Sequence, residues 1–281
     1  MRPQARAARI AWNTYWNAMR VYHRFEVVGL EHIVRRRGSV LVVGYHGRPW
    51  ALDLCMLGTL LEREHGVELR PIFHQGFEQP GLNWLIEGLG CVTSDGPRMA
   101  EVVAQGEPVV VTPGASREGF RPFYERYRVS WGGRMGYLRL ALKYKLPLVL
   151  AASAGVDDTY IGLNNGEKWG QRLKLPTGLP AWIGVGPLGV WPLSPPFPSK
   201  ITLHLSPPIH LEAHGPVDPE DAEQLRLIHR DIATRIQRML DDARNRGLKS
   251  PGQPRPPSES WGLPSTAQAV GEDAGVRKER Q

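Results

Sequence analysis

The stretch SVLVVGYHG, at residues 39–47, decides the fold of this chain. Its apolar side chains stand at successive positions, which indicates a strand buried on both faces, as in a parallel sheet. Two more runs of this kind follow, PVVVTPG at 108–114 and LPLVLAAS at 146–153. Stretches with helical patterns separate them. Strands that alternate with helices predict an α/β fold with a largely parallel central sheet flanked by helices.

The rest of the chain extends this pattern into one domain. We predict shorter strands at 25–31, 69–73, 91–94 and 201–211, and helices at 50–63, 80–89, 96–105, 132–145 and 219–246. A length of 281 residues allows one sizeable core. We therefore expect an N-terminal amphipathic helix within residues 1–30 and a single domain over 31–248. Residues 249–281, rich in Pro, Ser and Gly, are expected to be a disordered tail.

Composition narrows the possible partners. A formal net charge of +7 favours anionic partners, such as a phospholipid surface, coenzyme A or nucleic acid. The chain carries no nucleic-acid-binding motif, so we expect no nucleic acid as partner. Cys55 and Cys91 lack CxxC spacing, which indicates neither a disulfide framework nor a zinc site. We expect no metal, because the remaining metal-ligand candidates have no companion acids: His204, His210 and His214.

Two segments are candidates for membrane contact. The predicted helix at 4–24 combines aromatic rings with the basic side chains of Arg6, Arg9, Arg20 and Arg24. It either lies in a lipid headgroup layer or packs against the domain. Residues 175–199 carry no charge and hold seven prolines, so they form either a membrane-dipping or acyl-covering loop or an ordinary Pro-rich crossing. No apolar run approaches the roughly 20 residues of a membrane-spanning helix, and we expect a cytoplasmic protein, peripheral on the inner face of a membrane.

The most reactive side chain follows the first buried strand. His46 precedes Gly47, where the backbone can approach a ligand closely. Sites in α/β sheets gather at the carboxyl ends of strands, and histidine is well suited to accept a proton near neutral pH. Asp53 lies seven residues on, at the start of a predicted helix. It either accepts a hydrogen bond from the second imidazole nitrogen or caps the helix.

Three ordered blocks resemble the lysophospholipid acyltransferase superfamily. They are GYHGRPWALD at 44–53, VTPGASREGF at 111–120 and WGGRMGYLRLALKYKLPLVLAAS at 131–153. The resemblance runs over about residues 38–212 and is closest to the branch with PGG-R-E in its third block. That branch includes relatives of diacylglycerol acyltransferases. The resemblance implies catalytic roles for His46 and Asp53 and substrate binding by Gly47, Pro113, Gly114, Ser116, Arg117 and Glu118.

Two positions depart from the family pattern. The family places Asp five residues after His, where this chain has Ala51, and the nearest acid is Asp53. Phosphate-accepting members read P-E-G-T-R in the third block. Here Gly114 replaces the acid, Arg117 matches the basic residue and Glu118 follows it. The resemblance therefore implies a neutral glycerolipid or alcohol as acceptor rather than lysophosphatidate.

The implied reaction is a direct acyl transfer. His46, oriented by Asp53, deprotonates a lipid hydroxyl, which attacks the thioester of acyl-CoA or of an acyl carrier protein. Backbone amides near Gly47 or Gly114 are candidates to stabilise the oxyanion. No metal or cofactor is required.

Two other functions stay open. AASAG at 151–155 is one change from the G-x-S-x-G motif, so Ser153, Asp157 and a later histidine would form the triad of a serine hydrolase. A catalytically inactive, lipid-binding member of the same fold is the second alternative. GVGPLG at 184–189 matches a dinucleotide-binding pattern, but the prolines in and after it exclude the required helix.

Overall fold

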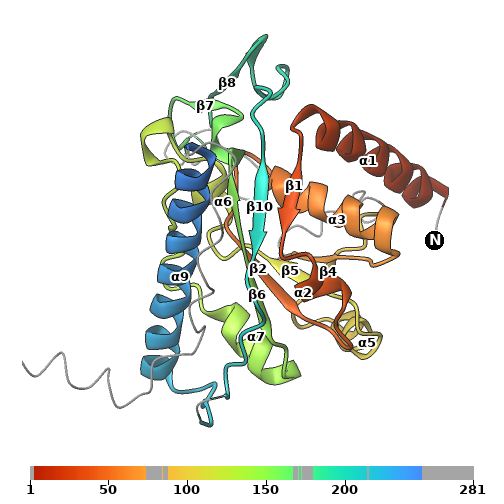
Figure 1. The fold of residues 1–281 in the computed structure, drawn as a ribbon, viewed down its shortest axis with the longest axis vertical. Helices are drawn as coiled ribbons and strands as arrows, with labels where there is room; N and C mark the ends of the chain where they lie inside the picture. Colours follow the sequence, from red (N-terminus) through yellow and green to blue (C-terminus); the bar gives the residue numbers. More distant parts are fainter. Residues whose placement is uncertain are drawn as a thin grey trace, which may run out of the picture.

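Seven strands form the central sheet in a computed structural model of the chain, in the order β1-β10-β6-β2-β5-β3-β4 (Figure 1). The structure describes residues 3–73, 84, 88–166, 170, 172, 180–213 and 215–248. The sheet strands are β1 (Glu26–Val28), β2 (Leu41–Gly44), β3 (Arg70–Phe73), β4 (Val92–Thr93), β5 (Val109–Val111), β6 (Leu148–Ala154) and β10 (Thr202–Leu205).

The strand directions confirm the predicted α/β fold. β6, β2, β5, β3 and β4 run parallel, each paired with its neighbour in that order. β10 is antiparallel to β6 and carries β1 as a parallel edge strand. The predicted strand at 201–211 thus becomes β10 and a single further bridge, between Ile209 and Leu148.

Helices cover both faces of the sheet (Figure 1). They are α1 (Pro3–Tyr22), α2 (Glu31–Val34), α3 (Leu52–His65), α5 (Pro97–Ala104), α6 (Ser116–Gly119), α7 (Gly136–Tyr144) and α9 (Ala222–Leu248), with short 3₁₀ turns η2 (Phe123–Glu125) and η3 (Val156–Asp158). Along β2, Leu41 and Val43 join one apolar cluster with α7 and α9, while Val42 joins another with α3. Alternate side chains of a strand point to opposite faces, so two covered faces account for a strand that is apolar throughout.

The N-terminal helix packs on the domain. Arg9 pairs with Glu62 at 2.8 Å and with Glu68 at 2.7 Å, and Arg20 pairs with Glu64. Trp16 is buried in the larger apolar cluster. Of the two interpretations open from the sequence, the structure shows the helix packed against the domain, with two of its arginines bound to acids of α3 and the loop that follows it.

A second, smaller sheet lies at one end of the molecule (Figure 1). It consists of β7 (Ile161–Gly162), β8 (Gly184–Gly186) and β9 (Gly189–Val190), all antiparallel. The described part of the Pro-rich segment therefore contains a hairpin, formed by β8 and β9. Within the described residues, no helix is both long and apolar enough to cross a membrane. The predicted tail at 249–281 lies outside these residues, as does the predicted helix at 80–89 apart from single positions.

Candidate functional site

The carboxyl ends of three adjacent parallel strands meet at one edge of the central sheet. β2 leads to His46, β5 leads to the loop with Gly114, and β6 leads to Asp157. β2 lies between the other two strands, so the two loops and the turn that carry these residues are neighbours. This is where α/β sheets place their sites.

The imidazole of His46 is arranged to accept a proton. Its Nδ1 lies 3.1 Å from the carbonyl oxygen of Gly47. A carbonyl only accepts, so the neutral ring carries its hydrogen on Nδ1 and leaves Nε2 as the basic nitrogen. Among the described residues Nε2 has no hydrogen-bond partner, and the side chain is partly exposed. Desolvation lowers the pKa of His46 to about 4, which keeps the ring neutral at physiological pH.

Two glycines make room for this ring and its loop. A Cβ on Gly119 would lie 2.6 Å from Cε1 of His46 and 2.7 Å from the carbonyl oxygen of Pro49. A Cβ on Gly47 would overlap the side chain of Val156. Any larger residue at either position would therefore displace the imidazole or its loop.

Asp53 has a different partner from the one expected. It is fully buried in the first turn of α3, and its Oδ2 accepts a hydrogen bond from Oγ of Ser153 at 2.5 Å. Its Oδ1 is buried and has no hydrogen-bond partner among the described residues. Burial raises the pKa of Asp53 to about 6. In this structure the Gly47 carbonyl, not Asp53, fixes the imidazole tautomer.

Ser153 lies within β6 rather than on a sharp turn. It is fully buried and pairs with Leu203 across the sheet. A hydrolase nucleophile needs an exposed hydroxyl at a strand-to-helix turn and a histidine beside it. Within the described residues, the hydroxyl contacts Asp53 and no histidine. The geometry required for the serine hydrolase is therefore missing.

Glu118 connects the first and third sequence blocks. It is fully buried, and its two carboxylate oxygens accept hydrogen bonds from the backbone amides of His46, at 3.0 Å, and Ser130, at 2.7 Å. Burial raises its pKa, which the nearby Arg121 opposes. A Cβ built on Gly114 would overlap the Glu118 carboxyl group. The carboxylate thus occupies the space where a side chain at position 114 would start.

Arg121 binds the same loops from the other side. Its guanidinium donates to the carbonyl oxygens of His46 at 3.2 Å and Arg128 at 2.6 Å, and it also contacts the Tyr45 hydroxyl. Tyr45 in turn donates to Asp157 at 2.5 Å. All three side chains are buried. Glu118 and Arg121 together anchor the main chain of His46 at both its amide and its carbonyl.

The other predicted binding residues surround the end of β5. Arg134 donates to the carbonyl oxygens of Pro113 at 3.2 Å and Gly114 at 2.7 Å. Ser116 and Arg117 open the short helix α6 and are exposed. The backbone amides of Gly47 and Gly114 donate no hydrogen bond within the part of the chain that the structure describes. Both glycines are buried, and their amides are candidates to bind an oxyanion.

An aromatic cluster adjoins the histidine. Phe120 follows Gly119 and packs against three tryptophans, with ring centroids 5.6 to 6.1 Å apart; it lies against Trp50, Trp182 and Trp191. Trp50 is half exposed, whereas Trp182 is buried. The cluster gives the histidine an apolar neighbour large enough to contact an alkyl chain.

Sequence reasoning found the histidine but missed its support. The sequence pattern assigns no role to Arg121, and it assigns Asp157 only a place in a hydrolase triad. The rule that found His46 also reaches Asp157, because it follows β6 at the same sheet edge. No local signal indicates that Arg121 contacts His46, 75 residues away. Among the described residues, no group of three or more His, Cys, Asp or Glu side chains is placed to hold a metal.

Comparisons with known proteins give several relatives, although no family model matches the chain. It is 28% identical over 210 residues to a Gallus gallus protein named DGAT1/2-independent enzyme synthesizing storage lipids, covering 73% of this chain and 57% of that protein. It is also 28% identical over 236 residues to an uncharacterized Mycobacterium tuberculosis protein, covering 80% and 64% respectively. The chain thus spans only 57% and 64% of the lengths of these curated relatives.

The chain is also similar to a solved structure. The 1-acyl-sn-glycerophosphate acyltransferase PlsC from Thermotoga maritima has a TM-score of 0.48 and 17% identity, over 86% of this chain and 84% of that chain. The curated relatives confirm the resemblance that the three sequence blocks indicated. This chain is similar to a group of proteins that includes named enzymes of storage-lipid synthesis.

Proposed function

We propose that this protein is an acyltransferase that moves a fatty acyl group from the thioester of coenzyme A, or of an acyl carrier protein, to a lipid hydroxyl. One observation carries the proposal. The partly exposed imidazole of His46 holds its hydrogen against the Gly47 carbonyl and leaves Nε2 open beside an aromatic cluster. The relatives named as lipid-synthesising enzymes support the class of substrate.

The chemistry is a single displacement through a tetrahedral intermediate. Nε2 of His46 accepts the proton of the acceptor hydroxyl while the hydroxyl oxygen attacks the thioester carbonyl carbon. The intermediate collapses, the carbon–sulfur bond breaks, and the thiolate leaves and takes the proton from the imidazolium. The amides of Gly47 and Gly114 are our candidates for donors to the oxyanion. A neutral imidazole is the required starting state, and its lowered pKa favours that state.

Asp53 stays a prediction as the partner of His46. Its Oδ1 is buried and has no hydrogen-bond partner among the described residues, whereas its Oδ2 accepts a hydrogen bond from Ser153. We propose that the His46 loop is positioned mainly by Glu118 and Arg121, which contact its backbone. Glu118 then acts through His46 rather than by touching the substrate.

The acceptor is proposed to be a neutral hydroxyl, such as that of a mono- or diacylglycerol or a long-chain alcohol. Gly114 stands where phosphate-accepting enzymes of the resembled family carry glutamate. The nearest acid, Glu118, is buried and bound to two backbone amides. Arg117 is exposed and is the cation best placed in this block to contact a phosphate.

A comparison of diacylglycerol with lysophosphatidate, in wild type and Arg117→Ala, decides the acceptor. A lysophosphatidate preference that collapses in the variant through a raised KM would contradict our choice.

Replacement of His46 tests the function itself. His46→Ala should lower the rate of acyl transfer at least about a hundredfold, because general-base catalysis contributes that much. The assay follows labelled acyl-CoA and lipid acceptors, with products separated. Thermal unfolding of the same sample checks that the variant is folded. Near-normal transfer by a folded His46→Ala protein would rule out this mechanism, and retained lipid binding without any wild-type turnover would favour the inactive lipid-binding alternative.

A further inference from the structure

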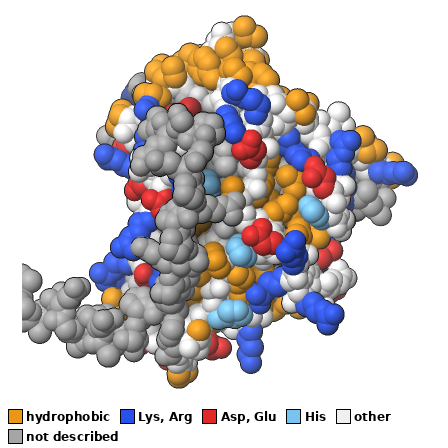
Figure 2. Space-filling view, in the orientation of Figure 1, with side chains coloured by type: hydrophobic (Ala, Val, Ile, Leu, Met, Phe, Trp, Pro, Cys, Tyr) orange, Lys and Arg blue, Asp and Glu red, His pale blue; other side chains and the backbone are white. Residues whose placement is uncertain are grey.

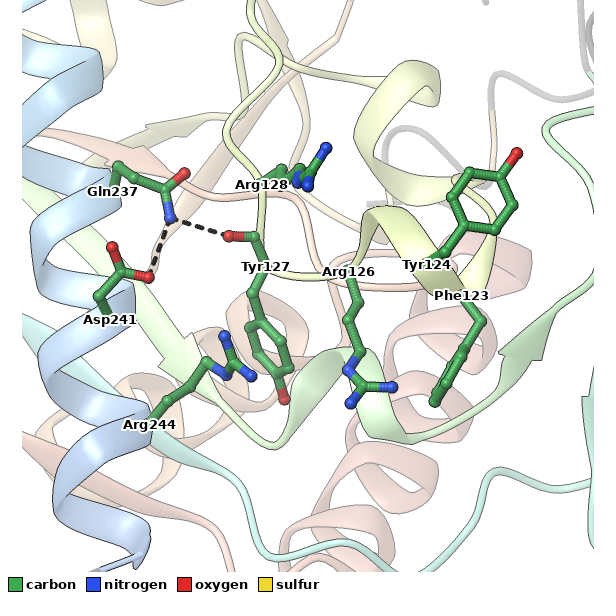
Figure 3. Close-up of a pocket in the computed structure, with 8 residues that line it drawn as sticks. All are labelled: Phe123, Tyr124, Arg126, Tyr127, Arg128, Gln237, Asp241 and Arg244. Atoms are coloured by element: carbon green, nitrogen blue, oxygen red, sulfur yellow. Dashed lines mark hydrogen bonds between the residues drawn. The ribbon is translucent and has the colours of Figure 1, made fainter.

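A concave site lies between α9 and the segment that follows α6 (Figure 3). Its volume is about 690 Å³, within the roughly 300–1,000 Å³ typical of small-ligand sites. Three arginines and one aspartate supply its charge, so the lining is net positive. They are Arg126, Arg128, Arg244 and Asp241.

The pocket is held open by hydrogen bonds between its two walls. Gln237 of α9 donates to the carbonyl oxygen of Tyr127 at 2.9 Å and accepts from the amide of Val129 at 2.9 Å. Figure 3 shows the amide of Gln237 reaching both Tyr127 and Asp241. These contacts fix the backbone of the segment against the helix, so the pocket exists before a ligand arrives.

Its arginines keep donors for an anion. Arg126 lies 4.0 Å above the Phe123 ring, and Arg244 lies 4.5 Å above the Tyr127 ring. A guanidinium stacked on a ring still directs its N–H groups outward, in the fork geometry that suits phosphate. Arg126 is 3.8 Å from Asp158, too far for a hydrogen bond, and Arg128 has an exposed side chain.

The pocket is connected to the candidate active site. Arg121 donates to the backbone carbonyls of Arg128 and His46, so one side chain holds both the pocket wall and the loop of the histidine. The pocket is therefore adjacent to His46 yet separate from it. A donor with an anionic end and a long flexible arm would suit this separation.

We propose that this pocket binds the phosphate groups at the nucleotide end of coenzyme A, an inference that rests on the proposed acyl transfer. The pantetheine arm then carries the thioester to His46. Tyr124 is 77% exposed at the rim, which leaves an aromatic face for the adenine base. An acyl carrier protein would instead need a broad basic surface, so a concave site of this size favours the nucleotide.

Direct binding of unacylated coenzyme A tests the inference without turnover. Titration calorimetry would compare wild type with Arg128→Ala and Arg244→Lys. A charge-assisted hydrogen bond lost at Arg128 should weaken coenzyme A binding by about tenfold or more. Arg244→Lys keeps the charge over Tyr127 but loses the fork, and should weaken binding less. Arg226→Ala, an exposed arginine of the same helix outside the pocket, is the matched control and should leave binding unchanged.

Two further measurements separate this inference from the proposed function. Pantetheine, which lacks the nucleotide, should bind wild type and Arg128→Ala equally, and added salt should weaken coenzyme A binding more in wild type than in Arg128→Ala. Coenzyme A binding that depends on the arginines and is retained in His46→Ala would support the pocket. If wild type nevertheless transferred no acyl group, the proposed acyl transfer would be wrong while the pocket assignment stood. Active enzyme whose KM for acyl-CoA is the same in Arg128→Ala would overturn the pocket and leave the function standing. Dependence on these arginines for an acidic carrier protein, but not for coenzyme A, would also overturn it.

Discussion

The state of a single imidazole governs the proposed chemistry. Desolvation, only partly offset by the hydrogen bond to Gly47, lowers the pKa of His46 to about 4. A lowered pKa means that the neutral, proton-accepting form persists well below pH 6.5. We therefore expect kcat/KM to stay constant from about pH 8 down to about pH 5 and to fall at lower pH. Unfolding measured across the same range separates titration from denaturation. A loss of activity centred at pH 6.5 or above in folded protein would contradict this assignment.

Asp53 allows stability and catalysis to be separated. Burial raises its pKa from 3.8 to about 6, so the folded protein binds more protons than the unfolded chain between these values. The free energy of unfolding therefore falls as pH rises through this window, by roughly 3 kcal/mol when complete. Asp53→Asn removes that dependence. Between pH 4 and pH 7, the free energy of unfolding should therefore fall less in Asp53→Asn than in wild type. Chemical denaturation of both proteins at the two pH values would show this.

The catalytic outcome of the same substitution decides the role of Asp53. Slow acyl transfer by folded Asp53→Asn would support a partnership with His46. Normal transfer would limit Asp53 to its bond with Ser153. Ser153→Ala serves as the companion variant, because it removes that bond and leaves the carboxylate. A hydrolase would lose all activity on this change, whereas the proposed acyltransferase would not.

At the scale of elements, the contact between the loop after β5 and the loop after β2 requires a glycine at position 114. A Cβ at position 114 would overlap the Glu118 carboxyl group, which accepts hydrogen bonds from the amides of His46 and Ser130. We expect Gly114→Ala to lower the free energy of unfolding by about 1–3 kcal/mol and to slow acyl transfer about tenfold or more. Gly133→Ala is the control, since a Cβ there meets no atom within 4 Å. Equal effects of the two changes would argue against the role given to Glu118.

The elements that the sequence predicted well are the strands that helices bury on both faces of the sheet. β2, β5 and β6 are short apolar runs, because helices cover both faces of the sheet and the side chains on both sides of each strand are buried. The sheet of β7, β8 and β9 was missed, because strands of two or three residues rich in glycine show neither alternation nor a long apolar run. The site shows the same division. His46 follows from its strand, but the contacts of Glu118 and Arg121 join segments 72 and 75 residues from the histidine. Such contacts are set by tertiary packing and leave no local pattern.

At the scale of the whole molecule, two surfaces are candidates for contact with a membrane, and they differ in the structure. On the N-terminal helix, Arg9 and Arg20 are bound to acids of the domain and Trp16 is buried. By contrast, the sheet of β7, β8 and β9 and the residues next to it expose aliphatic side chains. These gather at the end of the molecule seen at the top of Figure 2. We call this group the apolar tip; its members include Leu163, Ile183, Leu188, Val190 and Leu193.

Ring contacts connect the apolar tip to the proposed site. Trp191 follows β9 and packs against Phe120, which adjoins the glycine that contacts His46. We propose that a lipid acceptor leaves a bilayer at the tip and reaches the histidine along these aromatic side chains. We propose that the protein is peripheral on a membrane and that the tip supplies more of the binding free energy than the N-terminal arginines do.

Vesicle flotation with side-chain variants tests this ranking better than truncation, because removal of the helix would uncover the apolar surface that Trp16 packs against and would break the helix's ion pairs. Leu188 and Leu193 are 80% and 89% exposed, and burial of each in lipid contributes about 1.5–3 kcal/mol. Leu188→Asp with Leu193→Asp should therefore lower vesicle affinity at least about a hundredfold, on neutral and anionic vesicles alike. Arg6→Glu should weaken binding only to anionic vesicles, by about 1 kcal/mol or somewhat more, and salt should screen the difference. Leu227→Asp, on α9 away from the tip, is the control for an added charge. Flotation that is insensitive to the tip variant but abolished by Arg6→Glu would return the membrane contact to the N-terminal helix.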